Sequence, residues 1–282
     1  MWKFVNESVG GTSHRLSGVA CQDSSFVTPF RSEGDVGLIL ACSDGAGSAK
    51  ESEFGSRLAC DSVVHLAMQF LQSGKSVADL SPETLLDWMR SVHLALNAEA
   101  ERRTTTPREL ACTLLLCIVG QTAAACAQIG DGAIVISEGG GYRPVFWPQS
   151  GEYQNFTFFL TDPKFERNVH FEIINRAVLE VAIFSDGLQM LALKYDTKAA
   201  HQPFFAPLFS ALRASSDAQD LIVPMREFLD SPRVNDRTDD DKTLILATRL
   251  VDEPSRSDAT TAAQRDAAGV ADTSTGHADS TV

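Results

Sequence analysis

Short apolar runs separated by turn residues open the chain and predict β-strands. Three runs rich in Val, Ile, Leu and Phe lie before residue 45, with Gly, Ser and Pro between them. Two longer segments follow in which apolar residues recur every three or four positions, the spacing of a helix that buries one face. The pattern predicts strands at 2–9, 24–30 and 36–43, a helix at about 49–72 and a second helix at 81–103, counting its N-cap.

The residues at the start of each helical segment support these two helices. Ser48 and Glu51 have the spacing of a capping box ahead of the first helix. Ser81 is placed to cap the second helix, and Pro82 suits a first helical position, where no backbone N–H is needed. One face of this second helix carries Leu85, Trp88, Met89, Val92 and Leu96.

After residue 109 the pattern returns to short strands, joined by Gln-Thr, Asp-Gly and Gly-rich turns, and predicts an antiparallel meander. The resulting order of strands, helices, strands, helices and strand favours an α+β domain with antiparallel sheet over a doubly wound parallel one. Strands are predicted at 110–120, 122–130, 133–141, 142–147, 155–160, 169–174, 177–185 and 242–250, with helical stretches between Leu188 and Leu229.

Composition divides the chain into a folded region and a tail. From about Asp252 the sequence has almost no large apolar residue, so 252–282 cannot offset the entropy of ordering and is predicted to be disordered. In a chain of 282 residues of which 44% are hydrophobic, the remaining 1–251 can bury one large core or two small ones. We expect one folded domain there.

Charge and cysteine use narrow the classes of function. A formal net charge of −13 argues against nucleic acid or an anionic membrane as the main partner, since both need basic surface. No run approaches the ~20 apolar residues of a membrane span, and the start lacks a leader pattern, so we expect a cytoplasmic protein. The cysteines form no C-x-x-C pair and are predicted to be buried, reduced thiols; they are Cys21, Cys42, Cys60, Cys112, Cys117 and Cys126.

Aspartates recur at the ends of the predicted strands. Asp44, Asp131 and Asp186 each end an apolar run and precede Gly, Asp240 precedes the last strand, and Asp23 precedes the second. Strand ends on a rigid sheet position carboxylates more accurately than free loops do. Mg²⁺ and Mn²⁺ prefer oxygen ligands, and carboxylates brought close together repel without a cation. If these acids meet, they predict a metal site.

Each aspartate also has a local explanation that stays open at this point. Asp-Gly is a common hairpin turn, so Asp131 could be only a turn residue between two strands. Asp44 and Asp186 could be ordinary acids ahead of a helix, and 239–241 could be a solvated run of charge. The recurrence of one strand-end placement in a single chain favours the metal site.

The motifs around these aspartates appear in a fixed order. The chain contains SHRLSGVACQDSSF, ACSDGAGSAKESEFGS, ELACTLLLCIVG, QIGDGAIVI, IFSDGLQML and DDKTLILA. Over about residues 4–250 these segments resemble the successive motifs of the metal-dependent protein phosphatase family, the type 2C serine/threonine phosphatases, and more closely its bacterial branch. The resemblance implies a four-layer αββα sandwich of two antiparallel sheets flanked by helices, with a binuclear Mn²⁺ or Mg²⁺ site at one end.

The same resemblance implies a role for each acid. Asp44 matches the carboxylate that bridges both cations, and the Gly45 carbonyl matches a ligand of one of them. Asp23 matches an acid that orders metal-bound water. The remaining carboxylate ligands implied by motif position are Asp186 and Asp240 for the first cation and Asp131 for a third, more labile one.

Several residues differ from the family pattern near these acids. Gln22 stands where many members have Glu, which would remove one charged contact to the second cation. Ala46 replaces a His that animal members use to protonate the leaving group, although bacterial members commonly lack it. Met190 lies where an Asp ligand of the third cation is often found, and Asp241 lies where the family often has Asn.

The usual phosphate-binding Arg of the family falls at about Gly18 in this chain. Arg15 is the nearest substitute as a phosphate contact, and His14 is a candidate acid or phosphate donor. Either residue could equally be an ordinary loop residue.

The implied reaction needs no protein nucleophile, because two cations lower the pKa of a shared water until hydroxide forms near neutral pH. We expect a phosphatase acting on phosphoserine and phosphothreonine in proteins. One alternative is a catalytically weak module that regulates or binds phosphoproteins; another is an acidic cation-binding structural protein of unrelated fold, which would need the aspartates to lie far apart. The resemblance also implies a cognate Ser/Thr kinase or a von Willebrand A-type protein as a partner.

Overall fold

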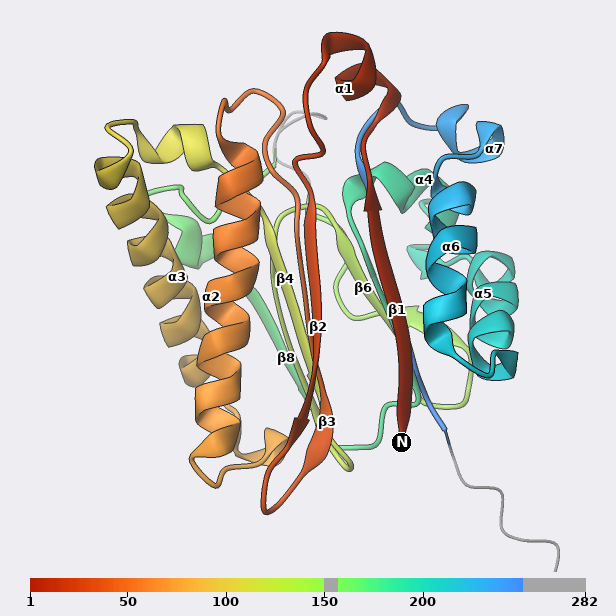
Figure 1. Cartoon of the computed structure of the whole chain (residues 1–282). Helices are drawn as coiled ribbons and strands as arrows, with labels where there is room; N and C mark the ends of the chain where they lie inside the picture. Colours follow the sequence, from red (N-terminus) through yellow and green to blue (C-terminus); the bar gives the residue numbers. More distant parts are fainter. Residues whose placement is uncertain (150–156, 251–282) are drawn as a thin grey trace, which may run out of the picture. The chain divides into compact units, whose positions relative to one another are not determined.

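Two five-stranded antiparallel sheets form the centre of the structure (Figure 1). The computed structural model describes residues 1–149 and 157–250. The first sheet has the order β2 (Ser24–Arg31), β3 (Val36–Ser43), β4 (Leu114–Val119), β5 (Ala124–Ile129) and β8 (His170–Ile174). The second has the order β1 (Trp2–Val9), β12 (Lys242–Arg249), β9 (Glu180–Phe184), β6 (Ala133–Ser137) and β7 (Tyr142–Pro144).

The central strands are buried on both faces, which explains why they read as continuous apolar runs rather than as alternating ones. In β3, Leu38 and Leu40 belong to a core that also contains Ile183 of β9 and Ile245 of β12, so they face the second sheet. Ile39 of the same strand belongs to a different core, under the helices of the first sheet. Each central strand therefore joins two hydrophobic layers.

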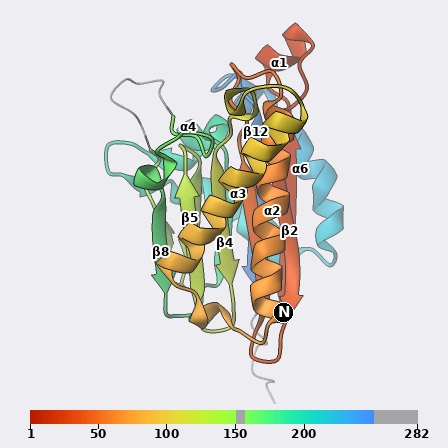
Figure 2. The ribbon, with the colours of Figure 1, turned by 90° about the vertical axis from the view of Figure 1, so that its left-hand side faces the viewer.

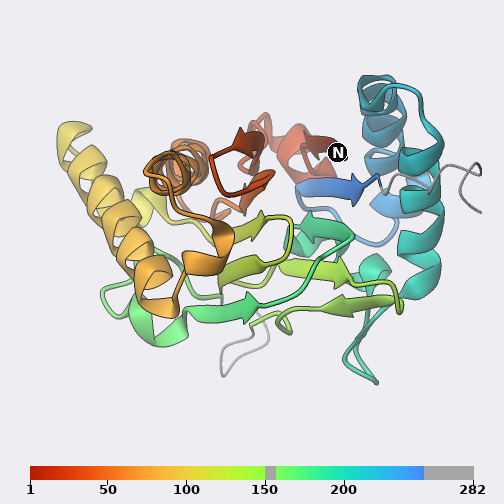
Figure 3. The same ribbon diagram turned by 90° about the horizontal axis from the view of Figure 1, so that it is seen from below.

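Helices cover the outer face of each sheet. In Figure 2 the helices α2 (Ser52–Gln72) and α3 (Pro82–Arg102) lie over the first sheet, and α2 packs Ala59, Val63 and Ala67 into its core. Figure 3 shows α5 (Gln202–Ala214) and α6 (Ile222–Leu229) on the opposite side, over the second sheet. The predicted α+β, four-layer αββα sandwich is confirmed.

Short elements complete the connections. They are α1 (Thr12–Ser17), α4 (Gln189–Ala192), α7 (Pro232–Asn235), the hairpin of β10 (Leu193–Lys194) and β11 (Ala199–Ala200), and the 3₁₀ helices η1 (Val77–Asp79), η2 (Pro107–Leu110), η3 (Phe165–Asn168), η4 (Asp186–Leu188) and η5 (Ala218–Leu221). None of the helices in the described ranges is long and apolar enough to cross a bilayer.

Helix starts were predicted with mixed success. Ser81 caps α3 as expected, since its Oγ accepts the Thr84 N–H at 3.2 Å. The capping box at Ser48 and Glu51 is wrong, because α2 begins at Ser52 and no side chain caps it. The Glu51 carboxylate instead forms an ion pair with Arg103 at 2.6 Å, which links the start of α2 to the end of α3.

Several strand predictions change as well; for example, 133–141 is shortened to 133–137 and 110–120 to 114–119. No strand forms at 157–160, the described part of the predicted strand 155–160; Leu160 donates a single backbone hydrogen bond to the Cys112 carbonyl at 2.9 Å. The predicted strand 142–147 is shortened to 142–144. All six cysteines are free, as expected; five are buried, but Cys21 is only partly buried. The predicted tail at 252–282 lies outside the described residues.

Candidate metal centre

Antiparallel pairing brings the strand-end aspartates to one end of the two sheets. Where neighbouring strands run in opposite directions, the residue before one strand lies beside the residue after the next. Asp23 precedes β2 and Asp44 follows β3; Asp131 precedes β6, Asp186 follows β9 and Asp240 precedes β12. The register that fixes this end pairs Ser24 with Ser43, Ala133 with Phe184 and Leu244 with Phe184.

The Asp-Gly step at Asp131 is not a hairpin turn, although its local sequence is typical of one. The strands on either side of it, β5 and β6, belong to different sheets, and β6 pairs with β7 and β9. The chain therefore crosses between the sheets at this point. Gly130 has φ of +109°, a conformation that favours glycine, and allows the crossing.

Three carboxylates form the centre of the site. Asp44, Asp131 and Asp186 each offer an oxygen, and these three atoms all lie within 4.8 Å of one another. Burial raises the pKa of Asp44 and of Asp186, and repulsion from the neighbouring aspartates raises both further. Burial likewise raises the pKa of Asp131. A divalent cation between these oxygens would relieve the repulsion.

Asp23 lies behind this centre and is held by two hydroxyl groups. Ser185 Oγ, at the end of β9, and Thr243 Oγ1, in β12, both donate to Asp23 Oδ2 at 2.7 Å. Because β2 belongs to the first sheet, these two hydrogen bonds join the sheets. Burial is the main cause that raises the pKa of Asp23 to about 6.

The site contains buried oxygens that lack hydrogen-bond donors. Among the described residues, the buried side-chain atoms without a partner include Gln22 Oε1, Asp23 Oδ1 and Asp131 Oδ1. Buried polar atoms are normally paired, so these unpaired acceptors need an explanation. All three are oxygen donors of the kind that Mg²⁺ and Mn²⁺ bind. The residues present therefore fit a site for hard divalent cations.

The backbone after Asp44 is packed too tightly for any residue but glycine. A Cβ at Gly45 would lie 2.7 Å from the Gln22 carbonyl oxygen and 2.8 Å from the Ser52 carbonyl oxygen. The Asp44 N–H donates to Thr113 Oγ1 at 2.9 Å, and the Thr113 N–H donates to the Asp44 carbonyl at 2.8 Å. This ladder holds the Asp44 carboxylate and the Gly45 carbonyl in place.

Asp240 lies at the edge of the centre and belongs to a second group. Its ligand atom lies within 4.8 Å of those of His14 and Asp241. It is exposed, but its charge contributes to the raised pKa of Asp186. Asp240 is therefore close to the first group without being part of the compact set of three.

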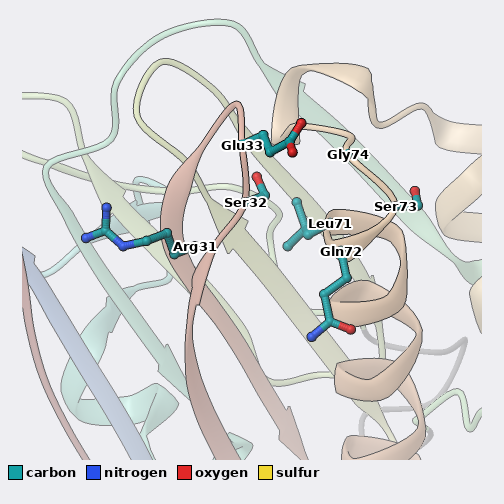
Figure 4. A pocket seen from close by; sticks show the side chains of 7 residues that line it. All are labelled: Arg31, Ser32, Glu33, Leu71, Gln72, Ser73 and Gly74. Carbon is teal, nitrogen blue, oxygen red and sulfur yellow. The ribbon is translucent and has the colours of Figure 1, made fainter.

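Two hollows in the surface differ in their position relative to these acids. A hollow of about 630 Å³ lies at the far end of β2 and α2, between Arg31, Glu33 and Gln72 (Figure 4), and it has no part in the acidic site. A groove of about 270 Å³ between β1 and β2 is lined by Asn6, Ser25 and Asp23. The groove approaches the metal centre from the side of Asp23.

Comparison with known proteins decides the family. The family model described as protein phosphatase 2C matches residues 10–229. The chain belongs to the protein phosphatase 2C family. It is a metal-dependent protein phosphatase, and the resemblance of its motifs to that family is confirmed.

Relatives of known structure or name agree with this assignment. Serine/threonine-protein phosphatase 3 of Escherichia coli (strain K12) is 34% identical over 249 residues, which cover 87% of this chain and 98% of that protein. The crystal structure of a bacterial serine phosphatase has a TM-score of 0.62 at 15% identity, and covers 90% of this chain and 100% of its own. A serine/threonine phosphatase from Staphylococcus aureus has a TM-score of 0.56 at 16% identity, covering 89% of this chain and 96% of its own.

These comparisons bear on the two alternative functions. The acidic structural protein of unrelated fold is wrong, since the fold is that of protein phosphatase 2C and three of the acids meet. The catalytically weak module is not favoured, because the chain matches named phosphatases over most of its length.

Residues that depart from the protein phosphatase 2C pattern occupy distinct places. Gly18 ends α1 with φ of +72°, so the position of the usual phosphate-binding Arg is a left-handed turn. Arg15 forms a two-pronged ion pair with Asp230, at 2.6 and 2.7 Å, which lowers the pKa of Asp230 to about 2. Ala46 is buried, and Met190 is 65% exposed. Contact between Arg15 and phosphate stays a prediction, and would need this ion pair to open.

Sequence reasoning missed the hydroxyl groups that support the acids. Besides Ser185 and Thr243 on Asp23, Thr157 Oγ1 donates to Asp131 Oδ2, and Gln189 donates to the Asp131 carbonyl. A signal was available for two of them, since Ser185 directly precedes Asp186 and Thr243 closely follows Asp240. Nothing local marks Thr157.

The metal-free protein should become more stable as the pH falls from about 7.5 to 5. An acid whose pKa is raised by folding holds a proton that the unfolded chain releases, so it penalises folding above its folded pKa. For Asp23 the penalty fades as pH falls from about 6 toward the ordinary pKa of 3.8. The lowered pKa of Asp230 acts oppositely, but its contribution is lost only as pH falls from about 4 to 2.

Thermal unfolding in EDTA at a series of pH values checks this prediction. The melting temperature should rise by several degrees toward pH 5, and excess Mn²⁺ should flatten or reverse the trend, since a cation stabilises the charged carboxylates that bind it. A melting temperature in EDTA that is flat or falls over this range would contradict the close packing of charged carboxylates.

Proposed function

We propose that this phosphatase removes phosphate from phosphoserine and phosphothreonine in proteins, using two Mn²⁺ or Mg²⁺ ions held at the strand ends. The observation that carries the proposal is the set of three carboxylates within 4.8 Å, beside unpaired buried oxygens. The name of the 34% identical Escherichia coli relative, a serine/threonine-protein phosphatase, supports the choice of phosphorylated residue.

Each residue near the centre has a proposed role toward the cations. Asp44 would be shared by both ions. The Gly45 carbonyl and Gln22 Oε1, on the side of the first sheet, would bind the second ion. The carboxylates proposed for the first ion are Asp186 and Asp240, and Asp131 is proposed for a third, weaker one.

When bound, the cations would lower the pKa of a shared water and stabilise the charge that develops on the phosphoryl oxygens. The chain's own residues would orient the reactants. Asp23 is fixed through Oδ2 by two hydroxyls, which leaves Oδ1 to accept a hydrogen bond from the attacking water. His14 Nδ1 lies 2.9 Å from Asp241, so protonation of the leaving group by His14 would fall to Nε2.

The choice of metal ion, the protein partner and the location in the cell are further predictions. Oxygen ligands suit both Mn²⁺ and Mg²⁺, so we propose either ion. A cognate Ser/Thr kinase or a von Willebrand A-type protein as partner, and a cytoplasmic location, stay predictions from the sequence. The net charge of −13 keeps nucleic acid and anionic membranes disfavoured as partners.

A phosphopeptide assay tests the function directly. Phosphate release from phosphoserine and phosphothreonine peptides should occur with Mn²⁺ or Mg²⁺, fall by about 100-fold or more in EDTA, and return when Mn²⁺ is added back. Peptides of the same sequence with phosphotyrosine serve as the control and should react far more slowly. Turnover that is insensitive to EDTA, or no release from any phosphopeptide, would contradict the proposal.

A further inference from the structure

A buried carboxylate outside the three-acid centre joins three segments of the chain. Asp241, just before β12, is only 2% exposed. Its Oδ1 accepts the Gly11 N–H at 2.6 Å and lies 2.9 Å from His14 Nδ1. Its Oδ2 accepts the Gln22 N–H at 2.6 Å. These hydrogen bonds span more than 200 residues of sequence.

These contacts indicate what Asp241 does. One Asp241 oxygen lies near a ring nitrogen of His14 and a carboxylate oxygen of Asp240. Both Asp241 oxygens already accept backbone N–H groups, so they are directed at the chain rather than at a cation. Charge-assisted hydrogen bonds of this length are strong and directional. Asp241 therefore acts as a clamp on the segment that contains Gln22.

The Gln22 main chain is held on its other side as well. Ser56 Oγ, in α2, donates to the Gln22 carbonyl at 2.6 Å. With both backbone polar groups fixed, the side chain has a defined starting direction, and its Oε1 is buried with no hydrogen-bond donor among the described residues. An amide oxygen prepared in this way suits a hard cation.

Charge gives a second reason to connect the two residues. The Gln22 side chain is neutral, whereas the Asp241 side chain that accepts its backbone N–H is a carboxylate. The charge of Asp241 reaches the centre, since it contributes to the raised pKa of Asp23. The residue that holds the Gln22 backbone therefore carries a negative charge that the Gln22 side chain does not.

We propose that Asp241 is a positioning residue for the second cation: it fixes Gln22 so that the amide oxygen meets the ion, and it supplies the negative charge that Gln22 lacks. The proposal rests on the two-cation site of the proposed function.

Calorimetric titration of the full-length protein with Mn²⁺ tests this role in Asp241→Asn, Gln22→Glu and the double variant. The Asn side chain has only one acceptor oxygen. Its NH₂ group would therefore face either the Gly11 N–H or the Gln22 N–H, and that hydrogen bond would be lost. Affinity for the second ion should fall about 10-fold or more, with the first changed by less than about threefold. Gln22→Glu together with Asp241→Asn restores the charge beside the ion, and should return the affinity to within about threefold of the unmodified protein.

The double variant separates this role from a merely structural one, because a lost clamp alone would not be rescued by a charge at position 22. Asp239→Asn, which removes a charge from an exposed side chain two residues away, is the matched control and should change affinity by less than about twofold. Unchanged Mn²⁺ affinity in Asp241→Asn, an equal loss in Asp239→Asn, or a double variant that binds the second ion no more tightly than Asp241→Asn would overturn the proposal. If the unmodified protein binds no second ion, the proposed function itself fails.

Discussion

Asp44→Asn should reduce metal-dependent phosphatase activity by about 1,000-fold or more, which corresponds to about 4 kcal/mol of lost transition-state stabilisation. Asp44, Asp131 and Asp186 each place an oxygen within 4.8 Å of the other two, and an amide in place of the Asp44 carboxylate offers a neutral and weaker ligand. Loss of the shared ligand would affect both cations together. Activity toward a phosphothreonine peptide and Mn²⁺ affinity by calorimetry are the measurements.

The fold should survive this substitution, because the groups that hold the backbone of Asp44 are unchanged. Thr113 pairs with its N–H and carbonyl, and neither contact uses the carboxylate. In EDTA the variant should melt several degrees above the unmodified protein, since one buried charge is removed from a repulsive group.

Asp61→Asn is the matched control for this variant. It removes one negative charge from a half-exposed site on α2, and should leave activity within about twofold of the unmodified protein. Activity retained in Asp44→Asn, or a lower melting temperature in EDTA, would show that this carboxylate is not the shared ligand.

Gly45→Ala should reduce activity by about 100-fold and lower the melting temperature of the metal-loaded protein. The added Cβ would lie 2.7 Å from the Gln22 carbonyl oxygen and 2.8 Å from Ser52 Cβ and its carbonyl oxygen. Two of these three neighbours are backbone atoms, so relief requires movement of the Gln22 segment or of the Gly45 carbonyl. Misplacement of about 1 Å at a catalytic site costs about this much activity.

Gly47→Ala provides a control within the same loop. Gly47 is exposed, and a Cβ there would meet nothing within 4 Å. Activity and melting temperature of this variant should stay close to those of the unmodified protein. Equal losses in both variants would indicate a general effect on loop flexibility, and normal activity in Gly45→Ala would contradict the tight packing at the metal centre.

The fold was largely predictable because its strongest signals are local. Helix α3 begins with Ser81 as its cap and buries Leu85, Trp88 and Met89, which recur at helical spacing. The strands β3 and β4 are apolar throughout because both their faces are covered, and such runs indicate buried strands. The capping box at Ser48 and Glu51 was predicted from a short spacing alone and does not form. Glu51 instead forms an ion pair with Arg103.

The positions of the acids could be predicted from the sequence more readily than the partners of the other residues near the site. Strand ends marked five aspartates, and the structure brings three of them, Asp44, Asp131 and Asp186, within 4.8 Å of one another. Their roles toward a cation stay predictions. Arg15 has the right type and place for a phosphate contact, but Asp230, from another element, pairs with it. Charge partners brought by distant elements cannot be read from the residues beside Arg15.

By itself, the sequence determined most of the strands, the two long helices α2 and α3 and which aspartates stand at strand ends, because hydrophobic period and turn residues act over a few positions. Only the tertiary structure decided that the Asp131–Gly132 step crosses between two sheets instead of closing a hairpin. It also decided that Asp241 holds the backbone of Gln22, 219 positions away. The crossing at Asp131 and the contact of Asp241 with Gln22 both depend on how the two sheets pack face to face. The residues next to each position in the sequence do not specify that packing.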